Sequence, residues 1–150
     1  MAEIKDPIAF ELFKNTIFSI ADEMALTICR TTYSGVLRDN MDFSTAFADA
    51  NGKLVAQGLT LPGHLGSIPD ALDVVVDRFG AEMKPGDMYI MNDPFDGGMH
   101  LPDIFIFQPL FAAGQRIAFA ATICHHADVG GRVPGSNASD STEKIGRAHV

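Results

Sequence analysis

The chain has 150 residues and a formal net charge of -8 at pH 7; 47% of its residues are hydrophobic and 20% are charged. This balance is typical of a globular domain rather than a disordered one. The acidic charge argues against nucleic-acid binding, which needs clustered Lys and Arg. We also expect no membrane span, because no apolar run reaches the ~18 to 20 residues that cross a bilayer.

The N-terminus indicates a cytoplasmic protein. A signal peptide has a basic start and an unbroken apolar stretch, whereas acidic residues interrupt the segment MAEIKDPIAFELFKN from its third residue on. Cys29 and Cys124 both lie inside apolar runs. We interpret them as buried free thiols rather than as a disulfide or a nucleophile.

The last seven residues, 144–150, are interpreted as foreign to the protein. They contain IGRAHV, which one reading frame of a common sequencing-library adapter encodes. Such a segment is excluded from reasoning about the fold, and His149 is not counted as a ligand. We therefore expect residues 1–143 to be the N-terminal part of a larger subunit.

A long amphipathic helix is the first expected element. Asp6 and Pro7 form a helix start, since Asp caps free N–H groups and Pro suits the first helical position. Apolar residues then recur every three to five positions from Ile8 to Ile28, and the helix is expected to end near Gly35. The simplest interpretation of its apolar face is core.

The rest of the chain alternates short strands, one helix and glycine-rich loops. Asn51-Gly52 predicts a hairpin between strands 43–48 and 53–57. A helix is expected over 68–79, ending at Gly80. Further strands are predicted over 88–91 (short and buried), 104–107 and 117–124. The mixture indicates an α+β fold.

Histidines and carboxylates near predicted strand ends favour a metal site. His100 and Asp103 stand three apart around Pro102, whose bend can turn both inward. Imidazole and carboxylate suit Zn, Mn or Fe. The alternative is a turn-capping Asp103 and a surface His100.

A second motif follows the strand 117–124. Because adjacent strand residues face opposite sides, one of His125 and His126 faces the site, and the residues themselves do not say which. The strands that precede the two motifs are expected to pair, which would bring the two loops together. Asp42 is a third candidate, although it also suits a solvated loop. Asp93, Asp96 and Asp128 are weaker candidates, and Asp93-Pro94 and Asp96-Gly97-Gly98 resemble turns.

Several segments in fixed order resemble the hydantoinase B/oxoprolinase family over about residues 5 to 143. They are DPIAFELFKNTIFSIADEM, MDFSTAFADANGKLVAQG, LPGHLGSIPDAL, PGDMYIMNDPFDGGMHLPDI and HHADVGGRVPGS. The resemblance implies a large subunit that holds a divalent metal and works with a hydantoinase A-type subunit that binds ATP. The matching metal positions would be Asp42, His100, Asp103 and His125.

The resemblance also implies a reaction, the ATP-dependent opening of a small cyclic amide such as a hydantoin or 5-oxoproline. His126 or Asp128 would then orient a ligand or move protons. Related family members are ketone carboxylases of the acetone and acetophenone type, which is the first alternative. Two others are an inactive metal-binding fragment and a metal-dependent hydrolase that needs no ATP.

Overall fold

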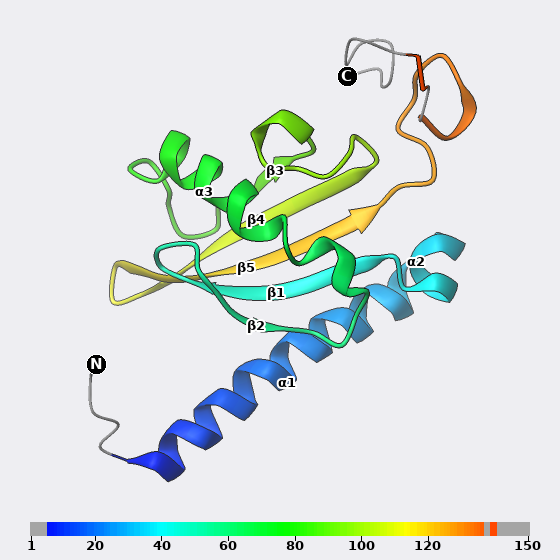
Figure 1. Ribbon diagram of the computed structural model, residues 1–150. Helices are drawn as coiled ribbons and strands as arrows, with labels where there is room; N and C mark the ends of the chain where they lie inside the picture. Colours follow the sequence, from blue (N-terminus) through cyan, green and yellow to red (C-terminus); the bar gives the residue numbers. More distant parts are fainter. Residues whose placement is uncertain (1–5, 137–138, 141–150) are drawn as a thin grey trace.

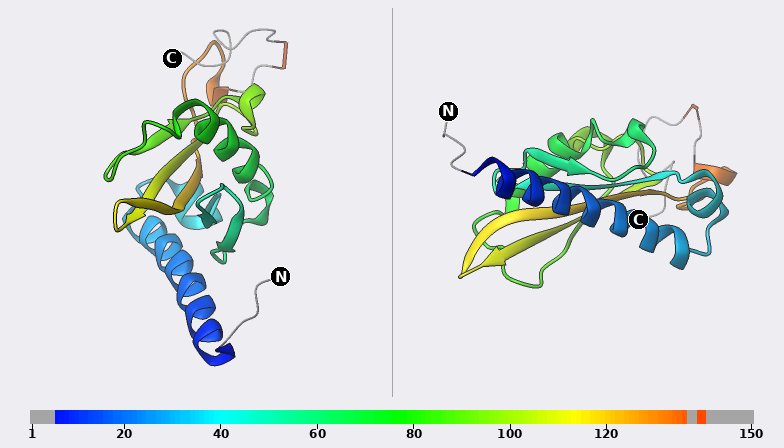
Figure 2. Two further views of the ribbon diagram at one scale, coloured as in Figure 1. Left: turned by 90° about the vertical axis from the view of Figure 1, so that its left-hand side faces the viewer. Right: turned by 90° about the horizontal axis from the view of Figure 1, so that it is seen from below.

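A computed structural model describes residues 6–136 and 139–140. The expected foreign segment, 144–150, lies outside the described residues. The fold is α+β, as predicted: a five-stranded antiparallel sheet with strand order β2-β1-β5-β4-β3 carries helices on its two faces (Figures 1 and 2). None of the helices in the described part is long and apolar enough to cross a membrane.

Helix α1 (Pro7–Thr31) begins where the sequence predicts. The Asp6 side chain accepts hydrogen bonds from the backbone N–H groups of Ile8 and Ala9, both at 3.0 Å. A short helix that was not predicted, α2 (Gly35–Asn40), follows, and it ends at Met41 in the left-handed conformation (φ 53°). This turn directs the chain into β1 (Phe43–Asp49).

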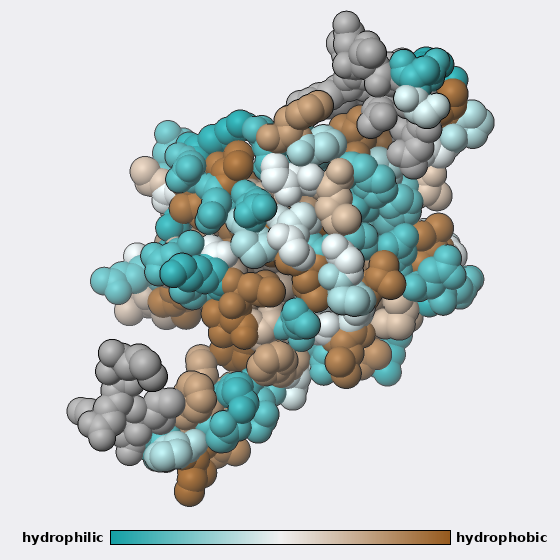
Figure 3. Space-filling view, viewed as in Figure 1, coloured by the Kyte–Doolittle hydropathy of each residue, from teal (hydrophilic) through white to brown (hydrophobic). Residues whose placement is uncertain are grey.

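The expectation that the apolar face of α1 is core is wrong for the described part of the chain. Only two alanines of the helix, Ala21 and Ala25, are buried, and Ile8 is 75% exposed. The helix runs diagonally past the edge of the sheet, so its N-terminal half extends beyond β2 (Leu54–Gln57). Figure 3 shows hydrophobic side chains on the surface at this lower end of the molecule.

Helix α3 (Ile68–Phe79) covers the opposite face of the sheet and has the predicted bounds. Its apolar stripe packs against inward-facing side chains of three strands, because alternate residues of a strand face the same side. The buried members of this main core on α3 and the sheet are Ile68, Ala71, Leu72, Val75, Ala46, Ala48, Phe105, Phe107, Phe119, Ala121 and Ile123.

The last three strands form a meander, with β3 (Tyr89–Met91), β4 (Asp103–Ala112) and β5 (Gln115–His125). Strand β3 lies at the edge of the sheet, and its Ile90 is 70% exposed, so the prediction of a buried strand there is wrong. β4 is longer than predicted and includes Pro109. The proline is tolerated because β3 pairs with β4 only as far as Phe107, so Pro109 has a neighbouring strand on one side.

Candidate metal centre

Two of the predicted ligands meet where β4 begins and β5 ends. Because the two strands are antiparallel, Asp103 at the start of β4 lies directly across from His125 at the end of β5. Oδ1 of Asp103 is 3.0 Å from Nδ1 of His125. The Asp103 side chain is fully buried, whereas that of His125 is 21% exposed. The site therefore opens toward solvent at one end of the sheet.

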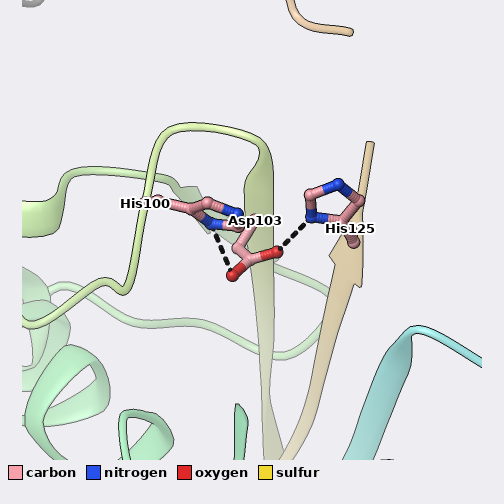
Figure 4. Close-up of side chains that lie close together, drawn as sticks. All are labelled: His100, Asp103 and His125. Atoms are coloured by element: carbon pink, nitrogen blue, oxygen red, sulfur yellow. Dashed lines mark hydrogen bonds and ion pairs between the residues drawn. The ribbon is translucent and has the colours of Figure 1, made fainter. Parts of the chain in front are cut away.

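His100 reaches the same carboxylate from the loop before β4. Its Nδ1 is 2.7 Å from Oδ2 of Asp103, so the two imidazoles flank the carboxylate (Figure 4). The backbone N–H of Asp103 donates to the carbonyl oxygen of His100 at 3.0 Å, which closes the bend around Pro102 that the sequence predicts. The bend turns both side chains inward, and the two rings have centroids 5.0 Å apart.

The expected strand pairing is wrong in one respect. The strand before His100, β3, does not pair with β5; it pairs with β4, the strand that follows the His100 motif. The two motifs still come together, because the start of one antiparallel strand lies beside the end of its neighbour. His126 strengthens this junction, since its backbone N–H donates to the carbonyl oxygen of Pro102 at 2.8 Å.

The alternation along β5 distinguishes the two histidines. Ile123 is buried in the core beneath α3, and His125 stands two residues further on the same face. His126 is exposed, with its Nδ1 3.1 Å from the carbonyl oxygen of Cys124. The position beside Asp103 is therefore that of His125, in agreement with the position that the family resemblance implies.

Asp42 lies next to this cluster. Its carbonyl oxygen accepts a hydrogen bond from the backbone N–H of His125 at 3.0 Å, which fixes the end of β5 against the start of β1. Its side chain approaches the cluster through a residue that sequence reasoning had not assigned to the site, His64. Nε2 of His64 is 3.4 Å from Oδ1 of Asp42 and 3.8 Å from Oδ2 of Asp103.

The three weaker carboxylate candidates hold loops. The side chain of Asp93 accepts from the backbone N–H of Phe95 at 3.0 Å, and Asp96 pairs with Arg78 at 2.7 Å. Asp128 accepts from the backbone N–H groups of Gly130 (2.8 Å) and Gly135 (3.0 Å). The contact of Asp93 agrees with the turn chemistry expected of it, and those of Asp128 order the loop that follows β5.

The donor set fits a divalent cation. One ligand atom from each of His100, Asp103 and His125 lies within 4.8 Å of the others. Nδ1 of His100 and Oδ2 of Asp103 are close, yet within the described chain neither has a hydrogen-bond partner. A buried carboxylate oxygen without a hydrogen bond is costly, and a cation held by these side chains would offset that cost. Two imidazoles and one carboxylate are suited to Zn, Mn or Fe.

Cys124 is poorly suited to nucleophilic chemistry. Burial raises the pKa of its thiol to about 11, and the negative charge of Asp103 adds to the effect. The reactive form of cysteine is the thiolate, so a raised pKa suppresses reactivity near neutral pH. Cys29 and Cys124 are both free thiols that are partly buried, which agrees with the expectation from sequence.

The fold and these side chains define an α+β unit with a candidate mononuclear metal centre at one end of its sheet. Comparison with known families gives a more specific assignment. The profile of the Hydantoinase B/oxoprolinase family matches residues 6–146, and the chain belongs to that family.

Two curated relatives illustrate the relationship. The 5-oxoprolinase of Dictyostelium discoideum is 38% identical over 131 residues, which are 87% of this chain and 10% of that protein. The caprolactamase subunit beta of Pseudomonas jessenii is 33% identical over 138 residues, which are 92% of this chain and 24% of that subunit. The chain thus spans a quarter or less of these relatives.

Two solved structures share the fold. The ATP-dependent caprolactamase from Pseudomonas jessenii has a TM-score of 0.83 at 26% identity, over 98% of this chain and 25% of that chain. Nucleotide-free acetone carboxylase has a TM-score of 0.86 at 20% identity, over 97% of this chain and 19% of that chain. The likeness to acetone carboxylase shows the fold alone.

Proposed function

We propose that this chain is the metal-binding part of a subunit of an ATP-dependent enzyme that opens cyclic amides. The observation that carries the proposal is the cluster of His100, Asp103 and His125, with the fully buried carboxylate of Asp103 at its centre. The names of the relatives support the substrate class, because a 5-oxoprolinase and a caprolactamase both act on cyclic amides. ATP would be bound by a partner subunit of the hydantoinase A type.

The proposed reaction begins with transfer of the γ-phosphoryl group of ATP to the amide oxygen, which leaves ADP. Water then adds to the activated carbon, and the ring C–N bond breaks as the nitrogen takes a proton. The product is an acyl phosphate, which a second water converts to a carboxylate and phosphate. The net reaction consumes one ATP and two waters for each ring opened and releases ADP and phosphate.

His100, Asp103, His125 and, from beside them, Asp42 would hold the cation. A bound divalent metal supplies Lewis acidity, which polarises a substrate oxygen and makes a water nucleophilic near neutral pH. His126 directly follows His125 and is exposed to solvent, and it would deliver the proton that the ring nitrogen takes. Asp128 would act on the same step by holding the loop that follows His126.

The first test concerns the metal alone. We expect the 150-residue chain to bind about one equivalent of Mn²⁺ or Zn²⁺, measured by calorimetry and elemental analysis, and His100→Ala to lose it. Asp77→Asn, which removes an exposed carboxylate of α3, is the control and should bind as the unchanged chain does. Full metal occupancy in the His100→Ala variant would contradict the assignment.

The second test concerns the reaction and needs an intact subunit with its ATP-binding partner. We expect 5-oxoproline, a hydantoin or caprolactam to stimulate ATP hydrolysis, with ring opening in step. Substitution of the residue that corresponds to His100 should abolish both. ATP-independent ring opening would instead indicate a simple metal-dependent hydrolase.

A ketone carboxylase is the second candidate function, since acetone carboxylase has the same fold. Among the two solved structures, the identity of 20% to acetone carboxylase is lower than the 26% to the caprolactamase, so the hydrolase is favoured. ATP hydrolysis that responds to a ketone with bicarbonate, and not to a cyclic amide, would reverse this preference.

A further inference from the structure

His64 is a buried histidine close to two carboxylates, that of Asp42 just before β1 and that of Asp103 at the start of β4. It ends the short 3-10 helix η1 (Pro62–His64) in the connection from β2 to α3, and its side chain is 7% exposed. Nε2 lies 3.4 Å from Oδ1 of Asp42 and 3.8 Å from Oδ2 of Asp103. The imidazole therefore stands beside the candidate metal centre on the side of β1.

The surroundings of His64 orient the ring. Nδ1 is 3.5 Å from Oγ of Ser44, and that hydroxyl donates its proton to the carbonyl oxygen of Leu61 at 2.7 Å. The backbone of His64 is also fixed, because its carbonyl oxygen accepts from the hydroxyl of Ser67 at 2.8 Å. The fixed backbone and the burial of the ring beside Ser44 leave Nε2 facing the two carboxylates.

A hydrogen-bond donor near Asp42 and Asp103 suits their two carboxylates. Ionised carboxylates can only accept hydrogen bonds, so a donor at Nε2 is the arrangement that suits both Asp42 and Asp103. Its distances to both oxygens exceed those of a formed hydrogen bond, about 2.7 to 3.2 Å. His64 thus lies near two acidic side chains that repel each other and forms a hydrogen bond with neither of these two oxygens.

We propose that His64 is a positioning residue that holds Asp42 and Asp103 together at the metal centre and thereby sets the affinity for the cation. The inference rests on the proposed function, because it takes His100, Asp103 and His125 as the metal site. It adds a role for a fourth histidine, and it links Asp42 to a cluster that the three central ligand atoms form without it.

The test compares three substitutions of His64 by titrating the 150-residue chain with Mn²⁺, followed by calorimetry and by electron paramagnetic resonance of the ion. His64→Gln keeps a side-chain N–H donor, whereas His64→Leu fills similar space without one. We expect His64→Ala and His64→Leu to weaken Mn²⁺ binding by about 10- to 100-fold and His64→Gln to recover most of the loss. Equal affinity in the Gln and Leu variants would show that the residue only fills space.

Coupling to Asp42 gives an independent readout. If His64 acts through that carboxylate, His64→Leu should have a smaller effect on Mn²⁺ affinity in an Asp42→Asn background than in the unchanged chain. Additive effects would overturn the proposal. Thr45→Val is the control for damage to β1, which follows Asp42, because the Thr45 hydroxyl donates to the Ala21 carbonyl on the α1 face and not toward the cluster.

The outcome for His100→Ala distinguishes a failure of the proposed metal site from a failure of the proposed role of His64. Loss of Mn²⁺ in His100→Ala together with unchanged binding in the His64 variants would overturn the role of His64 alone. Unchanged binding in His100→Ala would overturn the metal site itself. Circular dichroism and thermal melts, recorded before titration, identify any variant that fails to fold. The role of His64 is then judged from the Mn²⁺ affinities of His64→Gln and His64→Leu.

Discussion

Oδ1 of Asp103 lies 3.0 Å from Nδ1 of His125 on the neighbouring strand, and its other oxygen lies 2.7 Å from Nδ1 of His100. One fully buried carboxylate thus lies between two imidazoles, each of which reaches partly into solvent. Asp103 and His125 lie at the ends of paired strands, while the loop before β4 supplies His100. This arrangement fixes the donors before any ligand arrives.

Asp103→Asn is predicted to damage metal binding more than any change outside the cluster. The substitution keeps the shape of the side chain but removes the charge that faces both imidazoles. We expect the affinity for Mn²⁺ or Zn²⁺ to fall by at least about 100-fold in calorimetric titrations. The Asp77→Asn variant serves again as control, and comparable affinity in the two variants would refute the prediction.

Gly58→Ala is predicted to destabilise the contact between α1 and the sheet. A Cβ at Gly58 would lie 2.3 Å from Oγ1 of Thr45 and 2.8 Å from the carbonyl oxygen of Ala21. Relief of such contacts requires α1 to move, so we expect a loss of about 1 to 3 kcal/mol in the free energy of unfolding. Urea denaturation measures the loss. Gly66→Ala, where a Cβ meets nothing within 4 Å, should leave the free energy almost unchanged.

Arg116 is predicted to stabilise the end of the sheet opposite to the candidate metal centre. Nη1 donates to the carbonyl oxygen of Gly80 at 3.0 Å and Nη2 to that of Ala50 at 3.4 Å, and the guanidinium lies 5.1 Å from the ring centroid of Phe119. Arg116→Ala should lower the free energy of unfolding by about 1 to 3 kcal/mol, because it also leaves two carbonyls without this donor.

Arg30→Ala is the matched comparison for Arg116, since Arg30 is an exposed residue in the last turn of α1. It should change the free energy of unfolding by less than about 0.5 kcal/mol. Equal effects of the two substitutions in urea denaturation would mean that the contacts of Arg116 do not add to the free energy of unfolding.

The thiol of Cys124 is predicted to react slowly with iodoacetamide in the folded, metal-free chain. A pKa of about 11 leaves roughly one thiol in a thousand ionised at pH 8. The alkylation rate, followed by peptide mass spectrometry, should still be rising at pH 10. Chain unfolded in urea provides the control and should react as an ordinary thiol. A plateau near pH 8 in the folded chain is the contrary result.

The same pKa predicts a loss of stability at high pH. The folded value of about 11 is above the ordinary value of 9.0, so the unfolded chain releases the proton more readily. The contribution of the neutral thiol is therefore complete below about pH 9 and is lost as the pH rises toward 11. Cys124→Ser should flatten this part of the stability profile in urea denaturation at a series of pH values.

Local features of the fold follow from the amino-acid sequence. Asp6 and Pro7 predict the start of α1, the turn at Asn51-Gly52 predicts the hairpin, and the apolar spacing predicts α3 with its observed bounds. These signals act between residues close in the chain, where capping and side-chain period decide the outcome. The HLPD segment likewise predicts its own bend around Pro102.

Contacts between residues far apart in the chain depend on the tertiary structure. The choice of His125 over His126 depends on the register of β5 against β4, since a shift of one residue exchanges the two faces of a strand. The exposure of α1 depends on how far the helix extends beyond the sheet, which its periodicity does not specify. His64 joins Asp42 and Asp103 through folding of the connection between β2 and α3, because contacts between distant segments follow from packing rather than from spacing along the chain.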